Sequence, residues 1–290
     1  MFGQQARSGP RRGGFGLMRI IPLVFFGLYF LYFYATNRET VPITGRKQLV
    51  DMSREQEAAL GLQSYQEILS SEQVVTTGEG PEQVKRIAER LIQAIAKLDP
   101  QADPGFEWEA NVLQSDQANA FALPGGKIAV YTGIFPVAAN ADGLAVVMGH
   151  EIAHAIARHG AERMAYQKLV QVGSVAAGVS TSDMSPQARQ AVMAALGAGA
   201  QYGVLLPFSR DHETEADHMG LLFTAAACFD PREAPRLWER MGQLNKGNRP
   251  PEFASTHPAN QSRIEQLEAW MPEALEVRAK YCADQPAEKG

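Results

Sequence analysis

The sequence predicts a mostly helical α+β domain with a small sheet, preceded by one transmembrane helix. Residues 20–35 form a strongly apolar run without a charged side chain near the N-terminus. Polar and apolar residues alternate in short strand-like segments between residues 106 and 131, whereas apolar positions at helical spacing dominate from residue 142 onward. The chain has 290 residues, 45% of them hydrophobic and 20% charged, so it is long enough to bury a full core.

Charge is distributed unevenly along the chain. The formal net charge is −5, from 27 basic and 32 acidic residues, yet the first 38 residues carry five arginines and no acid. The remaining 22 basic and 32 acidic residues give the rest of the chain a net charge of −10. Because no cluster of lysine and arginine follows a predicted helix face, we do not expect nucleic acid as a partner.

Residues 17–36 are predicted to be an uncleaved signal anchor, because about 20 mostly apolar residues are enough to cross a bilayer. A cleavable signal peptide would show a shorter apolar run followed by an Ala-x-Ala-like site, but this run ends in Tyr-Phe-Tyr-Ala-Thr. A buried core helix is the alternative, and the basic tail at residues 1–16 argues against it. The arginines before the span favour a tail inside and a body outside, although Arg38, Arg46 and Lys47 follow the span.

The body is predicted to occupy residues 37–283, followed by a short C-terminal tail at residues 284–290. Its first helix begins at a capping box formed by Ser53 and Gln56, and a second helix opens near Pro81. Strands and further helices follow in order. Strands are expected over residues 106–112, 119–123 and 127–131, with a turn at Pro124-Gly125-Gly126, and helices begin near Ser209, Asp230 and Pro258.

Two features of the second half of the chain leave alternatives open. Residues 191–206 are apolar, and we expect a core helix rather than a second membrane span because the segment is short and contains Gln201 and Tyr202. Cys228 and Cys282 permit one disulfide in an oxidising compartment. Two buried free thiols are an equally good interpretation.

The most informative segment reads DGLAVVMGHEIAHAIARHG, over residues 142–160. On a helix that Asp142 can cap, His150 and His154 share one face with Cβ atoms about 5–6 Å apart, so both imidazoles can bind one Zn²⁺. Glu151 is turned by about 100° from His150, where it can act as a general base without becoming a ligand. A chance pair of surface histidines is the alternative. The apolar flanking residues instead predict a buried helix, in which unpaired polar groups are costly.

A catalytic zinc site needs a third protein ligand, and the acidic segment SRDHETEADHMG offers candidates. Glu213 and Asp217 lie four residues apart on a helix that Ser209 is expected to cap. Asp217 is well placed to accept a hydrogen bond from the free ring nitrogen of a ligating histidine. The small residues Ala216 and Gly220 would let this helix approach the histidine helix closely. An ordinary solvated acidic face is the alternative.

Four titratable residues near these motifs are not expected to bind metal. Glu215 points roughly to the side opposite Glu213 and Asp217. His159, His212 and His218 fall outside the ligand geometry. We assign these three histidines to solvent or to helix faces.

Three motifs follow one another along the chain: HEIAH, then ETEAD, then STHP with Arg263 and Ile264 after it. Together they resemble the HtpX and CAAX-prenyl-protease family of zinc metallopeptidases, metallopeptidase family 48. VPITGRKQLVDMS, ANAFALPGGKIAVYTGIF and FSRDHETEADHMG resemble its branch with one anchor and an extracytoplasmic domain. That branch includes periplasmic quality-control proteases of bacteria and a mitochondrial inner-membrane protease. The resemblance covers roughly residues 41–275, and it implies a gluzincin-like zincin fold with an HExxH active-site helix.

The resemblance also implies a site and an activity. His150, His154 and Glu213 would hold one Zn²⁺ per chain, with Glu151 as the catalytic base and Asp217 as the supporting acid. The implied activity is that of a membrane-anchored zinc metalloendopeptidase (EC 3.4.24 type) acting on unfolded, misfolded or membrane-associated polypeptides. Cleavage of prenylated peptides is not expected, because the multi-span members have several membrane helices and this chain shows one. The expected location is the bacterial inner membrane with the catalytic domain in the periplasm; the alternative is the mitochondrial inner membrane.

Two further assignments concern the substrate. The strand around residue 120 resembles the edge strand with which an extended substrate pairs in such proteases, and a plain hairpin edge is the alternative. The expected substrate-binding residues are Asn119, Ala120, Phe121 and Ala122. His257 precedes Pro258, the expected first helical position, so the helix dipole would keep its ring neutral. It could donate to a developing oxyanion or occupy the open coordination site, and a surface capping residue is the alternative.

The residues leave two other functions to be tested. One is a catalytically silent, membrane-tethered binding or chaperone-like protein of the same fold. The other is a zinc hydrolase that uses the same ligands on a non-peptide substrate. The sequence assigns no oligomeric state.

Overall fold

The computed structural model describes residues 15–102, 104–201, 205–244, 252–258 and 260–283. The tail expected at residues 284–290, and all but the last two residues of the basic N-terminal tail, lie outside the described residues. The helices are α1 (Phe15–Thr36), α2 (Arg54–Ser71), α3 (Glu79–Leu98), α4 (Phe135–Ala138), α5 (Ala141–Ile156), α6 (His159–Ser180), α7 (Pro186–Ala200), α8 (Leu206–Ala226), α9 (Glu233–Leu244), α10 (Glu252–Thr256) and α11 (Gln261–Cys282), with a 3₁₀ turn η1 (Thr132–Ile134). The strands are β1 (Arg38–Thr40), β2 (Lys47–Leu49), β3 (Val74–Val75), β4 (Glu109–Leu113), β5 (Ala120–Leu123) and β6 (Lys127–Tyr131). The prediction of a mostly helical α+β fold is confirmed.

The main sheet has four strands in the order β3-β4-β6-β5, and β1 and β2 form a separate two-stranded ribbon. β4 runs parallel to β6, while the other neighbours are antiparallel. Gly125 and Gly126 turn the chain between β5 and β6 at φ angles of 86° and 84°, which side chains rarely tolerate. The predicted hairpin is therefore confirmed, and among the described strands β5 lies at one edge of the sheet.

Helix α5 lies at the centre of the body, where it contacts α3, α8, α9 and β5. Every residue of α5 from Gly143 to Ile156 is buried except His154. Its neighbours contribute large side chains such as Phe223 of α8 and Trp238 of α9 to the same core. The metal-binding motif is therefore carried by the most buried helix of the body.

The helix starts show where sequence patterns succeed and where they fail. The capping box of Ser53 and Gln56 is confirmed at the start of α2. Asp142 was the wrong cap for α5, because the side chain of Asn140 accepts the first-turn N–H and Asp142 instead accepts the N–H of Asp230 at 2.8 Å. Ser209 is not a cap either, since α8 already begins at Leu206. A proline in the first turn of α8 costs no hydrogen bond, because the N–H groups there have no intrahelical acceptor.

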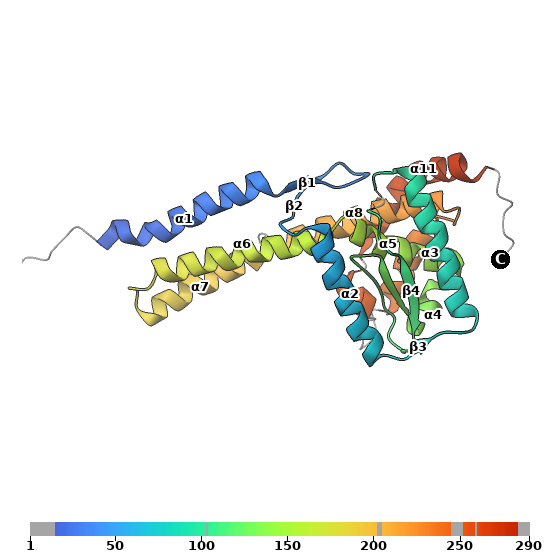
Figure 1. Cartoon of the computed structure of the whole chain (residues 1–290), viewed down its shortest axis with the longest axis horizontal. Coiled ribbons are helices and arrows are strands. Elements are labelled where there is room, and N and C mark those ends of the chain that lie inside the picture. The colour runs from blue at the N-terminus through green and yellow to red at the C-terminus, as the bar shows by residue number, and fades with distance from the viewer. Residues whose placement is uncertain (1–14, 103, 202–204, 245–251, 259, 284–290) are drawn as a thin grey trace, which may run out of the picture.

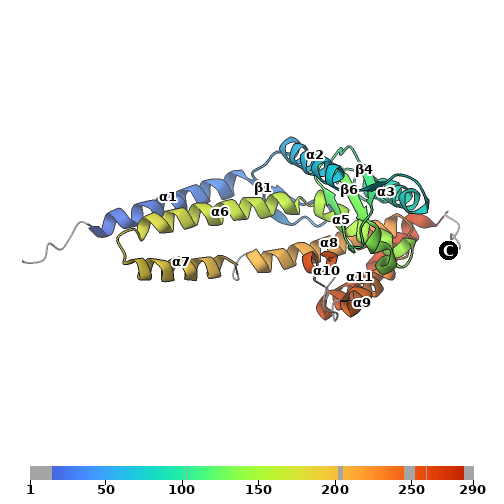
Figure 2. The same cartoon turned by 90° about the horizontal axis from the view of Figure 1, so that it is seen from below.

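Three helices form an arm that projects from the body, with α6 beside α1 and α7 running back along α6 (Figures 1 and 2). Met18–Thr36 within α1 is long and apolar enough to cross a membrane. The expectation of a core helix over residues 191–206 is wrong for its described part, because α7 has no buried residue. The reason is the position of α7, which packs against α6 in the arm and not in the body. Residues 202–204 of the predicted segment lie outside the described residues.

Cys228 and Cys282 form a disulfide that joins the chain just after α8 to the last residue of α11. Of the two interpretations that the sequence allowed, the paired one is therefore present. The bond closes a separation of 54 residues. It fixes the C-terminal helix against the helix that carries the acidic motif.

Candidate metal centre

The two histidines of the motif leave α5 in its last two turns and point at one another. Their ring centroids are 4.7 Å apart, and the Nε2 atoms of His150 and His154 lie 3.1 Å apart. Glu213 on α8 lies beside both rings: its Oε2 atom is 3.4 Å from His150 Nε2, and its Oε1 atom is 3.4 Å from His154 Nε2. The predicted i, i+4 pair and the acidic segment 59 residues further on thus meet in space.

The close approach of α8 to α5 depends on small residues at the crossing. A Cβ added to Gly220 would lie 2.8 Å from the backbone nitrogen of His150, and one added to Gly149 would lie 3.1 Å from the carbonyl oxygen of Gly220. Ala216, one turn before Gly220, is fully buried. The expectation that these small residues let the two helices approach is confirmed, and it explains how Glu213 reaches the histidines.

His257 is the fourth member of the ligand group. Potential ligand atoms of His150, His154, Glu213 and His257 all lie within 4.8 Å of one another. The Nδ1 atom of His257 is 3.2 Å from His150 Nε2 and 2.8 Å from Glu213 Oε2. Two ligands at about 2.0–2.1 Å from a tetrahedral zinc lie about 3.3 Å apart, so these spacings fit a zinc ion.

The expected helical context of His257 was wrong. His257 follows α10, and its N–H donates to the carbonyl of Phe253 at 2.8 Å, while α11 begins only at Gln261 behind the cap Asn260. It therefore lies at the C-terminal end of a short helix, so the predicted N-terminal dipole effect on its charge does not apply. The residue still reaches the ligand group, because the turn after α10 carries its ring there.

Glu151 lies in the same site without joining the ligand group. Its side chain is buried, and its Oε1 atom makes no hydrogen bond to any described residue, although it lies 3.4 Å from His257 Nε2. Burial raises the pKa of Glu151. A buried carboxylate oxygen without a hydrogen bond, beside a ligand group, fits a general base that meets a water only in the complete site.

Asp217 supports His150 from behind, as the sequence predicted. Its Oδ1 atom is 3.1 Å from His150 Nδ1, the nitrogen that faces away from the ligand group. Although burial opposes the charge, Arg263 and His150 hold the pKa of Asp217 below its usual value. Such a carboxylate fixes the orientation of a ligating imidazole.

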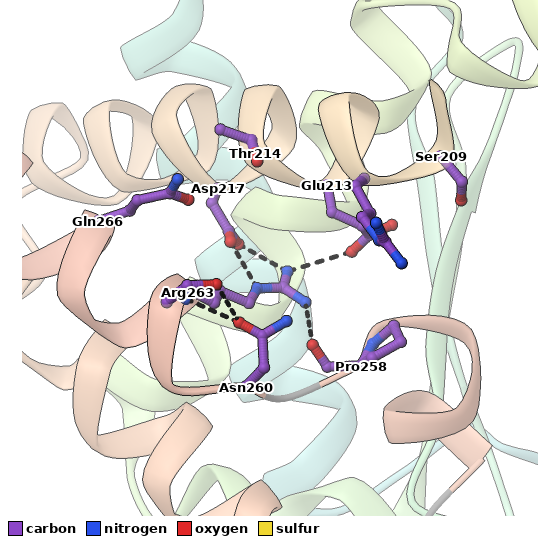
Figure 3. Close-up of a pocket in the computed structure, with 10 residues that line it drawn as sticks. Ser209, Glu213, Thr214, Asp217, Pro258, Asn260, Arg263 and Gln266 are labelled. Atoms are coloured by element: carbon purple, nitrogen blue, oxygen red, sulfur yellow. Dashed lines mark hydrogen bonds and ion pairs between the residues drawn. The ribbon is translucent and has the colours of Figure 1, made fainter. Parts of the chain in front are cut away.

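Arg263 is a residue of the site to which the sequence motifs assigned no role. Its guanidinium donates to Asp217 Oδ1 at 2.7 Å and lies 3.2 Å from Glu213 Oε2, so it holds these two acidic side chains of α8 (Figure 3). The guanidinium also stacks 3.4 Å over the ring of Trp238. A cavity of about 510 Å³ opens beside this cluster, between α8 and α11. The sequence analysis named Arg263 only as part of the motif after STHP that resembles the family.

A second polar cluster lies behind His154, and the sequence interpretation missed it. His159, His212 and Glu215 are buried, not solvent-facing. His159 Nε2 lies 2.9 Å from Glu215 Oε2, and the rings of His159 and His212 stack at 4.1 Å. Burial lowers the pKa of His159 to about 4, so its ring is neutral at pH 7. His218 alone keeps a helix-face position: it is half-buried, pairs with exposed Glu273 and lies 4.8 Å from the ring of Trp270.

Arg46, from the turn between β1 and β2, closes this second cluster. It donates to both carboxylate oxygens of Glu162 and to Glu215 at 2.7 Å, while Thr44 also hydrogen-bonds Glu215. Burial opposes the charge on Glu215, but the bonds from His159, Thr44 and Arg46 lower its pKa to about 2. The chain just after α1 is thereby attached to the back of the metal centre.

The predicted substrate strand lies next to α5, which it contacts along its length. Ala120, Phe121 and Ala122 belong to β5, whereas Asn119 precedes the strand and its carbonyl accepts the N–H of Tyr131. Phe121 and Ala122 are half-buried, and Ala120 is buried. Because β5 pairs only with β6 among the described strands, its outer edge is oriented for pairing with another extended chain.

Comparison with known proteins points to one family. Residues 80–271 match the profile of Peptidase family M48. Mitochondrial metalloendopeptidase OMA1 of Schizosaccharomyces pombe is 38% identical over 249 residues, which cover 83% of this chain and 69% of the relative. Mitochondrial metalloendopeptidase OMA1 of Saccharomyces cerevisiae is 35% identical over 265 residues, covering 84% and 72%. The Beta-barrel assembly-enhancing protease of Escherichia coli is 28% identical over 236 residues, covering 80% of this chain and 47% of the relative.

Proposed function

The chain belongs to peptidase family M48, and from that membership we propose that it is a membrane-anchored zinc metalloendopeptidase (EC 3.4.24 type). Its proposed substrates are unfolded, misfolded or membrane-associated polypeptides, in a protein quality-control role. One observation carries the proposal: three potential ligand side chains converge beside the buried carboxylate of Glu151, whose Oε1 atom has no hydrogen bond to a described residue. The relatives named metalloendopeptidase and protease support a peptide substrate over the catalytically silent alternative.

The proposed roles follow from the positions of the side chains. His150, His154 and Glu213 would hold the zinc, which when bound would lower the pKa of a water and polarise the substrate carbonyl. Glu151 accepts the proton of the attacking water and delivers it to the leaving amine. Asp217 orients His150, and Arg263 keeps Asp217 and Glu213 in place.

Two alternative roles are proposed for His257. Its Nδ1 atom lies among the potential ligand atoms, so it would occupy the open metal position while no substrate is present. The other role is to donate a hydrogen bond to the oxyanion that develops on the substrate carbonyl.

The substrate is proposed to lie along β5 as an added strand. An extended peptide that pairs with an edge strand is held through its backbone, so sequence preference is broad. We assign this role to the segment that begins at Asn119 and continues through Ala120, Phe121 and Ala122. Broad preference suits a protease for misfolded chains.

The proposed location is the bacterial inner membrane, with residues 17–36 as the anchor and the domain of residues 37–283 in the periplasm. The disulfide between Cys228 and Cys282 supports an oxidising compartment for the body. The alternative is the mitochondrial inner membrane, because the names of the OMA1 relatives place those proteins in the mitochondrion. Fractionation of the source cell distinguishes the two.

Zinc analysis of the purified full chain, paired with hydrolysis of casein as an unfolded substrate, tests the proposed function. One zinc per chain together with casein cleavage that a chelator abolishes supports it. Zinc without cleavage would favour a non-peptide substrate. A chain that binds no zinc would favour the tethered binding protein.

A further inference from the structure

Helices α6 and α7 of the arm carry large apolar side chains that no described residue covers. Val175 and Val179 of α6 are 64% and 55% exposed, and Leu196 of α7 is 47% exposed. We propose that the lipid bilayer covers them: α6 beyond Lys168 and α7 form a helical hairpin that crosses the membrane beside α1 and returns. This inference rests on α1 as a membrane span, as proposed above, but not on peptidase activity.

The packing of α6 against α1 sets the depth of the hairpin. A Cβ added to Gly173 would lie 3.0 Å from the ring of Phe26, so the two helices touch at that point. Phe26 lies near the middle of the apolar span Met18–Thr36. If α1 crosses the bilayer, Gly173 lies close to the bilayer midplane. Contact through a glycine is typical of helix pairs inside membranes.

Ion pairs mark both ends of the paired region. At the body end, Lys168 pairs with Asp51 and lies 5.8 Å from the ring centroid of Phe33. At the far end, Arg19 and Asp183 form a salt bridge of 3.2 Å. Residues 169–182, between these ends, contain no charged side chain. Charges at both rims and none between them is the pattern that a bilayer imposes.

The return helix has the same character. Its one charged residue, Arg189, lies in the first turn of α7, near the end where Arg19 and Asp183 meet. The rest of α7, residues 190–200, carries no charge, and the 15 residues of this helix extend about 22 Å. The far end of the hairpin is thus the end that carries arginine, in line with the basic tail before α1.

The charge-free part of α6 is short for a membrane span. Fourteen residues at 1.5 Å each extend about 21 Å, against about 30 Å for a typical hydrocarbon core. Lys168 can extend its side chain to the interface, and a bilayer thins locally around short spans. On α1 the charge-free stretch is longer, because 18 residues separate Arg19 from Arg38.

The hairpin would place the metal centre close to the membrane. Helix α6 begins at His159, directly behind the ligand His154, and Glu213 lies in the third turn of α8. Nine helical steps separate His159 from Lys168, which is about 14 Å along α6. Peptide chains that emerge from the bilayer would then meet the site within a few residues of the surface.

Thiol labelling of the full chain in sealed vesicles tests the hairpin. Because Cys228 and Cys282 are paired, an introduced cysteine is the only free thiol. Met184→Cys places it at the tip of the hairpin, Gln66→Cys on exposed α2 reports the body side, and Met18→Cys reports the tail side. Each variant is treated with a membrane-impermeant maleimide before and after permeabilisation.

The hairpin predicts that Met184→Cys and Met18→Cys label alike. In vesicles of the orientation in which Gln66→Cys labels fully from outside, both should label at least about ten-fold more after permeabilisation than before it. Val175→Cys, within the bilayer, should label only in detergent. Labelling of Met184→Cys from outside to the same extent as Gln66→Cys would overturn the proposal. So would labelling of Met18→Cys and Gln66→Cys from the same side, because α1 would then not cross the membrane. The readout needs no catalysis, so loss of the peptidase assignment would appear separately.

Discussion

His154 and His159 face each other through their Nδ1 atoms, which lie 2.8 Å apart. His159 Nε2 is bonded to Glu215, so its neutral ring donates there and accepts from His154 through Nδ1. This arrangement fixes the tautomer of His154 and leaves its Nε2 atom unprotonated toward the ligand group. The carboxylate that orients this ligand therefore acts through an intervening imidazole, whereas Asp217 contacts His150 directly.

Replacing His159 with Phe should weaken zinc binding. The substitution keeps a ring in the cavity but removes the acceptor for His154, and loss of such an orienting partner typically costs about 10–100-fold in metal affinity. Competition with a zinc chelator measures the change. His218→Phe serves as the control, because His218 pairs with exposed Glu273 and lies against Trp270, away from the potential ligands. Equal affinities for the two variants would contradict the relay.

Glu213→Ala should lose zinc binding at micromolar metal, since it removes a ligand. Asp217→Asn should weaken binding by about 10–100-fold, because it alters only the partner of His150. Zinc content after dialysis against a chelator separates the two variants. If Glu215→Ala strips the zinc completely while Glu213→Ala keeps it, the assignment of the ligand on α8 is wrong.

Local chemistry explains which parts of this structure the sequence could predict. The capping box at Ser53, the hairpin turn at Gly125 and the His150–His154 spacing each depend on residues within a few positions of one another. The crossing of α5 and α8 was also predictable, because Ala216 and Gly220 stand beside the acidic pair. The assignment of His150, His154 and Glu213 as ligands came from the resemblance to the family and stays a prediction.

The missed residues depend on contacts between distant parts of the chain. Arg46 reaches Glu215 across 169 positions, and nothing in the turn around Arg46 indicates that partner. Arg263 stacks on Trp238 and holds Asp217, which no helical period reveals. For α7, apolar composition suggested the core, but composition cannot distinguish burial by protein from burial by lipid.

His257→Phe should leave zinc near one per chain, because three other ligands remain. The variant should lower kcat by about 10²–10³-fold, the usual loss for one oxyanion donor. Steady-state hydrolysis of casein by the full chain measures it. A kcat equal to or above that of the unsubstituted chain would show that His257 only fills the ligand group.

Glu233 gives a pH dependence of stability away from the metal centre. Burial opposes its charge, but Arg236 at 2.8 Å and Arg240 at 3.1 Å lower its pKa below the usual 4.5. A carboxylate with a lowered pKa stabilises the fold fully above the unfolded-state value and loses this contribution as the pH falls through its folded-state value. Chemical denaturation should therefore show Glu233→Gln less stable at pH 7, with the difference shrinking below pH 4.5. A constant difference at all pH values would contradict this cause.

The central claim is most directly tested by measuring bound zinc and casein hydrolysis in parallel for the unsubstituted full chain and for Glu151→Gln. Glu151 is buried beside the ligand group without belonging to it, so the variant should retain the fold and one zinc per chain. Casein cleavage should fall to background, because the proton acceptor is lost while every ligand remains. Cleavage by Glu151→Gln at the unsubstituted rate, or zinc without any cleavage in the unsubstituted chain, would contradict the assignment.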